Sequence, residues 1–210
     1  DNETNREFVK RFRSWYQKGY LTTQTLYGAY TSGLFVAENG TRSYMSIGSS
    51  AGATHQRPTK GADGNYPFEV GIATIPQVNP DRPKVISQGP SVCIFNKSNP
   101  QEVMTTSTDF QAEFSMTSGY VPVLKSVADH PVYKEFVSKA NGGDYISALS
   151  ASVCLSQQEA YYTSPAFNGS STARSQVQNL LARSLSAQGN DDEVIDKAFK
   201  EAITECEYQN

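Results

Sequence analysis

The stretch SYMSIGSSAGA, residues 43–53, decides the expected fold, because a strand-like segment runs directly into a series of small residues. A turn signal at Asn39-Gly40 precedes it, and Ser43–Gly48 then has the short apolar and aromatic composition of a buried strand. The following residues, Gly48 to Ala53, are too small to continue a strand with a packed face. The stretch therefore predicts a strand that delivers Ser49 and Ser50 to a loop.

The rest of the chain predicts more strands and several helices. FEVGIATIP (68–76) has the pattern of a strand that Pro76 ends, and KVISQGPSVCIF (84–95) has two strand-like halves joined at Gln88-Gly89-Pro90. A capping box of Thr4 and Glu7 starts a helix that Gly19 ends. Helices are also predicted near residues 32–38, 98–118, 130–140, 144–158, 170–189 and 190–206, and Asp144 is the expected N-terminal cap of the one that begins there. Isolated strands separated by helices favour α/β organisation over a helical bundle.

The predicted helices at both ends of the chain each have an apolar face. In the first, Phe8, Phe12, Trp15 and Tyr16 recur at helical spacing and predict an amphipathic surface helix. The last two helices carry matching stripes, which are formed by Val177, Leu180, Leu181 and Leu185 in one and by Val194, Ala198, Phe199, Ala202 and Ile203 in the other.

Composition favours a globular binding protein. The chain has 210 residues, 38% of them hydrophobic, which is sufficient for a core. A net charge of −3, from 18 basic and 21 acidic residues spread without long runs, gives no electrostatic basis for binding nucleic acid or an anionic membrane. Twelve Tyr and ten Phe against two His provide many flat amphipathic surfaces and few general bases. This balance favours binding over catalysis.

No metal or cofactor site is indicated. His55 and His130 have no second ligand three or four residues away, and neither a Walker A loop nor a GxGxxG loop is present. The cysteines Cys93, Cys154 and Cys206 are far apart and form no CxxC pair, so three buried thiols are expected. No apolar run reaches the roughly 20 residues that span a bilayer. The chain begins at Asp1 and not with methionine, which suggests processing or excision from a longer protein.

The segment GSSAG, Gly48 to Gly52, leaves an enzymatic alternative open. It fits G-x-S-x-G, the nucleophile elbow of α/β-hydrolases, with Ser50 as the nucleophile. An elbow needs a sustained helix afterwards, yet Pro58 limits any such helix. A triad would need His130, whose neighbour Asp129 is equally well explained as a helix cap. The same serines can instead form an array of hydrogen-bond donors for an anionic or polyhydroxyl ligand, or simply a tight turn.

Four stretches in order resemble the extracytoplasmic solute-binding proteins of ABC importers, in the group that binds oligosaccharides and glycerol 3-phosphate. They are SYMSIGSSAGA, VGIATIPQ with VISQGPSVCIFNKSNPQE, FQAEFSMTSGYVPV, and SPAFNGSSTARSQVQNLL. The resemblance covers nearly the whole chain, with the order and spacing of the later half of that family. It implies a periplasmic-binding-protein-like fold of type II, and an N-terminal half that the given sequence does not contain.

The resemblance also implies a division into lobes. Residues 1–88 and 141–210 would form most of the C-terminal lobe, and residues 89–140 an excursion into the other, incomplete lobe. One departure concerns residues 99–110, where the family usually has a longer, more apolar helix than QEVMTTSTD provides. A second is Gln88-Gly89-Pro90, which replaces the glycine pair that is usual in the family.

Matched residue by residue, the resemblance implies a ligand site. In GYVPV (119–123) Gly119 ends a helix and Pro122 stiffens the backbone after the tyrosine, so Tyr120 would be held ready to donate a hydrogen bond or stack on a sugar ring. The other implied ligand-binding residues are Ser49, Ser50, Gly89, Phe167 and Arg174, with Tyr162 as a second stacking candidate. From the residues alone, Tyr120, Phe167 and Tyr162 fit a local core equally well, and Arg174 fits a solvated helix face.

The resemblance implies a function without catalysis. The protein would capture an extracellular carbohydrate, polyol or glycerol phosphate by closure of its lobes, and would present it to the membrane permease of an ABC transporter. In the full-length protein it would be periplasmic or anchored outside the bacterial membrane as a lipoprotein. No cofactor is expected. Two other classes remain open, a serine hydrolase that uses Ser50 and a protein-interaction module.

Overall fold

A computed structural model describes residues 1–37, 42–90, 100–141 and 145–207. The chain divides into two compact units, which are described separately: the first comprises Asp1–Thr31 with Pro165–Asn210, and the second comprises Ser32–Ser164. This division by contacts does not coincide with the two predicted lobes, whose boundaries stay a prediction. No helix in the described part of the chain combines the length and the apolar composition needed to cross a bilayer.

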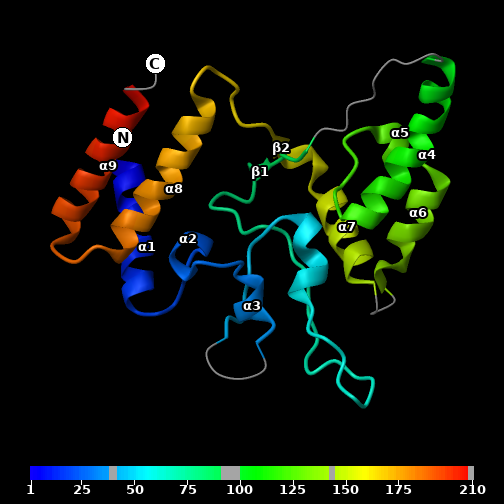
Figure 1. The fold of residues 1–210 in the computed structure, drawn as a ribbon, viewed down its shortest axis with the longest axis horizontal. Helices are drawn as coiled ribbons and strands as arrows, with labels where there is room; N and C mark the ends of the chain where they lie inside the picture. Colours follow the sequence, from blue (N-terminus) through cyan, green and yellow to red (C-terminus); the bar gives the residue numbers. More distant parts are fainter. Residues whose placement is uncertain (38–41, 91–99, 142–144, 208–210) are drawn as a thin grey trace. The chain divides into compact units, whose positions relative to one another are not determined.

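The first unit is a helical bundle. Helices α1 (Glu3–Gln17), α8 (Ser170–Ser186) and α9 (Asp191–Glu207) lie side by side, and the short α2 (Gln24–Tyr27) contacts α8 (Figure 1). Their shared core contains small and branched side chains with one aromatic ring, namely Val9, Leu180, Ile195, Ala198, Phe199 and Ala202. The periodicity of the sequence predicted these three helices because each has one apolar face.

The buried face of α1 is not formed by its row of aromatic residues. Val9 and Arg13 are buried, whereas Phe8 is 51% and Trp15 38% exposed. Phe12 lies between these rings, with centroids 4.4 Å from Phe8 and 5.3 Å from Trp15, so the aromatic row runs along an exposed side of the helix. The apolar stripes of α8 and α9 were right in part, since Leu180, Leu185, Ala198, Phe199 and Ala202 are buried but Val177 and Ile203 are exposed.

The polar contacts of Arg13 explain why a charged side chain lies in this core. Its Nε lies 2.6 Å from a carboxylate oxygen of Asp191, and its guanidinium donates to the carbonyl oxygens of Ser184 at 2.6 Å, Ala187 at 2.8 Å and Gly189 at 3.2 Å. Carbonyls at the end of a helix lack intrahelical donors and carry partial negative charge. Arg13 thus neutralises the end of α8 and ties it to the start of α9.

The start of α1 differs from the predicted cap. Asn2, not Thr4, caps α1, and its side-chain oxygen accepts a hydrogen bond from the amide of Asn5 at 2.8 Å. Asn190 caps α9 by accepting from amides of its first turn at 3.0 and 3.3 Å. The predicted cap Asp144 lies outside the described residues. Asparagine accepts such bonds as readily as aspartate or serine, so either choice was compatible with the composition.

The second unit has its core among four helices. These are α4 (Pro100–Ser118), α5 (Lys125–Ala128), α6 (Pro131–Ser138) and α7 (Ile146–Ser156), and Figure 1 shows them gathered in one group. Ala112, Val127, Tyr133 and Ala151 are buried together, with Met116, Phe136, Val137 and Leu155 packed against them. The unit also contains α3 (Ser32–Phe35) and three short 3₁₀ segments, η1 (Ser50–Gln56), η2 (Lys139–Asn141) and η3 (Gln158–Ala160). Of these, η1 packs on both α7 and α3.

Only a small sheet forms among the described residues. Strands β1 (Val85–Ile86) and β2 (Tyr161–Tyr162) pair in parallel, with Val85 opposite Tyr161. The strands predicted at residues 43–48 and 68–76 are absent, and Tyr44, Met45 and Ile47 are instead 86%, 70% and 62% exposed. A strand needs a hydrogen-bonded neighbour, which composition does not supply. The described chain is mostly helical, so the α/β class stays a prediction.

Candidate functional site

Ser49 and Ser50 lie at the start of η1, in the second unit. Ser49 has an extended backbone, and its hydroxyl oxygen accepts a weak hydrogen bond from the amide of Ala51 at 3.4 Å. It is exposed, and Ser50 is half-buried. The hydroxyl proton of Ser49 is not used in this cap, so the group keeps a donor for a ligand. The segment then turns through η1 and ends at Gln56, before Pro58.

Gly119 joins the end of α4 to this serine segment. Its φ is +75°, and a Cβ atom added there would lie 3.1 Å from the Cα of Ala51 and 3.3 Å from the carbonyl oxygen of Ser50. Both the backbone angle and the close contact disfavour a side chain at this position. Glycine relieves this strain, and it places Tyr120 next to η1.

Tyr120 lies against a third segment of the chain. A Cβ atom added to Gly89 would be 3.6 Å from both Cδ1 and Cε1 of the Tyr120 ring, which is ordinary van der Waals contact. The ring is half-buried, and its hydroxyl makes no hydrogen bond to any part of the chain that the structure describes. Three segments distant in sequence, around Ser50, Gly89 and Tyr120, thus meet in this unit. We call them the tyrosine site.

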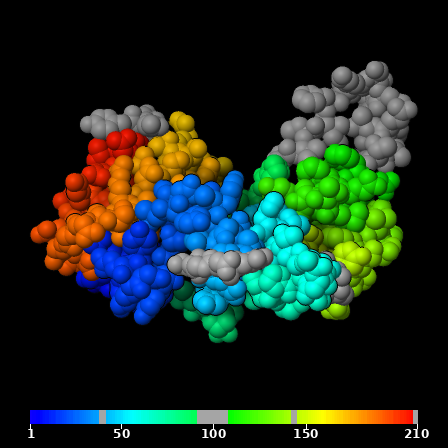
Figure 2. All heavy atoms as spheres, turned by 60° about the horizontal axis from the view of Figure 1, so that its bottom comes forward, coloured from blue at the N-terminus to red at the C-terminus, as the bar shows by residue number. Residues whose placement is uncertain are grey.

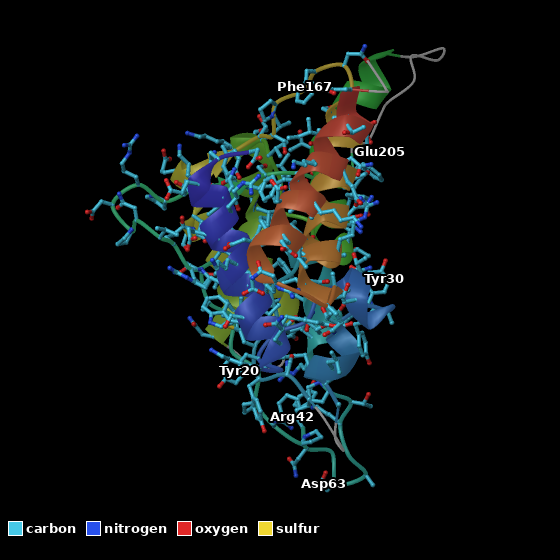
Figure 3. All side chains as sticks on the ribbon, turned by 90° about the vertical axis from the view of Figure 1, so that its left-hand side faces the viewer. Tyr20, Tyr30, Arg42, Asp63, Phe167 and Glu205 are labelled. Carbon is cyan, nitrogen blue, oxygen red and sulfur yellow. The ribbon has the colours of Figure 1, made fainter. Side chains whose placement is uncertain are left out.

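Phe167 and Arg174 belong to the first unit. Phe167 is 58% exposed on the loop that precedes α8 (Figure 3). Arg174 is exposed on α8 and makes no ion pair with the described residues. Tyr162 is on β2 and 43% exposed. These exposures disfavour a core role for Phe167 and Tyr162, and an approach of Phe167 and Arg174 to the tyrosine site stays a prediction.

The geometry expected of a nucleophile elbow is not found. No strand precedes Ser50 within the described residues, and a short 3₁₀ turn replaces the helix that would stabilise an oxyanion. The side chain of His130 contacts Asp109 on α4, with Nε2 2.8 Å from a carboxylate oxygen. The alternative role expected for Asp129, as the cap of α6, is not found, because His130 occupies the cap position and no side-chain hydrogen bond caps the helix. Asp129 pairs with Lys134 at 2.8 Å, and this contact lowers the pKa of its carboxyl group.

The buried polar groups of the second unit are structural. Burial raises the pKa of Tyr133 and of Tyr161 to about 12, and the Tyr161 hydroxyl donates to the carbonyl oxygen of Cys154 at 2.7 Å. Burial also raises the pKa of the Cys154 thiol, which disfavours the reactive thiolate. Cys154 and Cys206 are half-buried, whereas buried thiols were predicted. Cys93 lies outside the described residues. Within the described ranges, no group of three potential ligands could hold a metal ion.

Comparison with known families identifies the chain. Residues 1–140 match the model of the family described as bacterial extracellular solute-binding protein. The chain belongs to this family. Comparisons with curated proteins and with solved structures gave no match.

Family membership confirms the resemblance at a coarse level. It supports a solute-binding component of an ABC transporter, located outside the cytoplasm, that binds small-molecule solutes and delivers them to the permease. Proteins of this family are generally not enzymes. The match also suggests a periplasmic-binding-protein-like fold. This match does not identify the solute or its chemical class, and it does not show a lipid anchor.

Proposed function

We propose that the protein captures an extracellular carbohydrate, or a related polyol such as glycerol phosphate, for import by an ABC permease. The observation that carries this proposal is the Tyr120 ring, which lies over Gly89 with a hydroxyl that has no partner among the described residues. An aromatic face with an available hydroxyl suits a sugar, because the ring stacks on C–H groups while the hydroxyl bonds to the ligand.

Each residue of the tyrosine site has a distinct role in this proposal. Tyr120 stacks and donates a hydrogen bond, and Ser49 and Ser50 provide hydroxyl or amide donors. Gly89 keeps the backbone open so that a solute can approach it. Hydrogen bonds to hydroxyl groups are directional, so they select among solutes, and the ring adds contact area.

Residues of the first unit complete the proposed contacts. Phe167 offers a second exposed aromatic face, and Arg174 offers a guanidinium group for a polar or phosphate group of the solute. We retain the lobe division at residues 1–88 with 141–210, and 89–140, as part of this proposal. Ligand contacts from both lobes would favour a closed form that the permease recognises. A lipid anchor in the full-length protein would keep it at the membrane.

A thermal-shift screen tests the proposal. The protein is titrated with oligosaccharides, monosaccharides, polyols and glycerol phosphates, and a ligand present at about 100 times its dissociation constant should stabilise the folded state by about 2.7 kcal/mol. Tyr120→Ala should abolish the shift for the true solute. Tyr120→Phe should retain part of it, because the ring remains and only the hydroxyl is lost.

Two further variants separate binding from stability. Gly89→Ala introduces a methyl group at ordinary contact distance from Tyr120, so it should fold normally yet weaken the solute-induced shift. Tyr30→Ala removes a tyrosine that is 77% exposed in the first unit, and serves as the matched control. Equal shifts in the Tyr120→Ala and Tyr30→Ala variants would refute the assignment of the tyrosine site. Labelling of Ser50 by a fluorophosphonate would instead support the hydrolase.

A further inference from the structure

A second group of residues in the 32–164 unit has an arrangement typical of recognition. The guanidinium carbon of Arg42 lies 4.4 Å from the ring centre of Phe68 and 5.3 Å from that of Tyr44. Phe35 packs edge-on against Phe68, with ring centres 6.3 Å apart. Arg42 is half-buried, while Tyr44 is 86% exposed. Two aromatic faces therefore hold this guanidinium group at the surface.

A second arginine is held in the same way. The guanidinium carbon of Arg57 lies only 3.8 Å from the ring centre of Tyr66, and Nζ of Lys60 lies 4.9 Å from it. One nitrogen of Arg57, Nη1, is shielded from solvent and has no hydrogen-bond partner within the described residues. Stacking on an aromatic face restricts the guanidinium plane and leaves its edge for hydrogen bonding. Arg57 is thus positioned by a ring and not by a carboxylate.

Neither arginine is neutralised by the described chain. No ion pair of Arg42 or Arg57 is found there, although other cations of the protein pair with acids, as Lys134 does with Asp129. Asp63 lies nearby in sequence, but its pKa is lowered by hydrogen bonds from Asn65 and not by a cation. Two positive groups with fixed orientation and no carboxylate are arranged for an anionic partner.

The rings that contact the two arginines come from neighbouring positions of the chain. Tyr66 and Phe68 are separated by a single residue, so their Cα atoms lie at most about 7 Å apart. Figure 2 shows the segment around residues 50–70 exposed on one face, and Figure 3 marks Arg42 and Asp63 on its loops. We call Arg42, Tyr44, Arg57, Tyr66 and Phe68 the arginine–aromatic patch.

We infer that the arginine–aromatic patch binds an acidic segment of a polypeptide. An acidic segment carries several carboxylates, and carboxylates are the groups that a guanidinium binds through two parallel hydrogen bonds. Arginine and tyrosine are also enriched where proteins bind each other. A membrane surface is a poorer match, because each cation contributes only about 1 kcal/mol there and the chain carries a net charge of −3. This inference does not depend on the identity of the solute.

Binding of a fluorescent hexaglutamate peptide tests the inference. Fluorescence anisotropy at low salt should show saturable binding that weakens as salt is added. Arg42→Gln and Arg57→Gln should each weaken binding about fivefold, the effect expected for one exposed charged pair. Arg42→Lys and Arg57→Lys keep the charge but lose the planar fork, and should weaken it less. The control Arg82→Gln removes an exposed arginine of the same unit and should have no effect.

The outcomes separate the possible partners. Absence of peptide binding, or an equal loss with Arg82→Gln, would overturn the inference. Binding of inorganic phosphate or phosphatidylglycerol vesicles that depends on Arg42 and Arg57, without peptide binding, would also overturn it. Far-UV circular dichroism checks folding. If a glutamine variant unfolds, the Tyr44→Ala variant tests the inference in its place. This ring is highly exposed, so its removal should disturb no core, and its loss should still lower the affinity for the peptide.

Discussion

Replacement of Arg13 by alanine should destabilise the first unit by about 3–5 kcal/mol, the cost typical of breaking a buried charged network. The side chain of Arg13 is 1% exposed and that of Asp191 37% exposed, so the ion pair itself is partly screened by solvent. The bond to the carbonyl of Ser184 is buried, and those to the carbonyls of Ala187 and Gly189 are partly buried. Each bond from a charged donor contributes about 1.5–3 kcal/mol, but bonds of one side chain are not additive.

Urea unfolding measures this effect directly. Trp15 is the sole tryptophan and lies on the same helix, so its fluorescence reports the first unit. Arg11→Ala is the matched control, because Arg11 is an exposed arginine of α1 and should change stability by less than about 0.5 kcal/mol. Arg13→Lys should be intermediate, since an ammonium group cannot reach all four acceptors at once.

The partner variant decides between two explanations. If the carbonyl bonds dominate, Asp191→Ala should cost clearly less than Arg13→Ala, because Arg13 would keep three acceptors. If Asp191→Ala costs as much as Arg13→Ala, or if Arg13→Ala costs less than about 1 kcal/mol, the assigned role of Arg13 at the end of α8 is refuted.

Contacts elsewhere in the chain lead to three more predictions. Gly119→Ala should destabilise the second unit by about 2–4 kcal/mol in urea unfolding, because it adds a Cβ at positive φ against backbone atoms, whereas Gly89→Ala should cost less than about 1 kcal/mol. Tyr133 and Tyr161 should titrate near pH 12 in tyrosinate absorbance, and the Phe variant of each should remove one late step. Since the neutral phenols are favoured in the folded state, this stability is complete below pH 10 and is lost as the pH rises through 12. Asn190→Ala should cost about 1 kcal/mol by thermal unfolding, through loss of the α9 cap.

Helices were predictable because their signals are local. Spacing of apolar residues, caps and terminating glycines located α1, α4, α6, α7, α8 and α9 to within a few residues. The buried face of α1 was not predictable in this way. Burial of Arg13 depends on carbonyls at the end of α8, which is more than 170 residues away in sequence for Ser184. The spacing of apolar residues in α1 gives no sign of this arrangement.

Strands were mispredicted for a related physical reason. The composition of residues 43–48 and 68–76 suits strands, yet pairing depends on a neighbour that local composition cannot specify. The small ladder between Val85 and Tyr161 shows the converse, since no strand was expected at Tyr161 and this residue pairs because β1 lies beside it.

The candidate site was predictable in part through turn chemistry. Gly119 was expected to end a helix and present Tyr120, and the structure shows this with a positive φ. The contact of Gly119 with η1 links residues almost 70 positions apart and has no local signal. The arginine–aromatic patch was not recognised in the sequence, where residues 56–67 had the composition of a polar loop. Aromatic residues placed near Arg42, Arg57 and Lys60 in the sequence were the available signal.

The three atoms that lie nearest to a Cβ built on Gly119 are main-chain atoms of Ser50 and Ala51, in η1. An anchor of this kind tolerates any side chain that preserves the backbone path. Exchange of Ser49 or Ser50 would therefore change the chemical groups beside Tyr120 without displacing its ring. Related transporters could evolve preferences for different nutrients by such exchanges, with the same framework inherited unchanged.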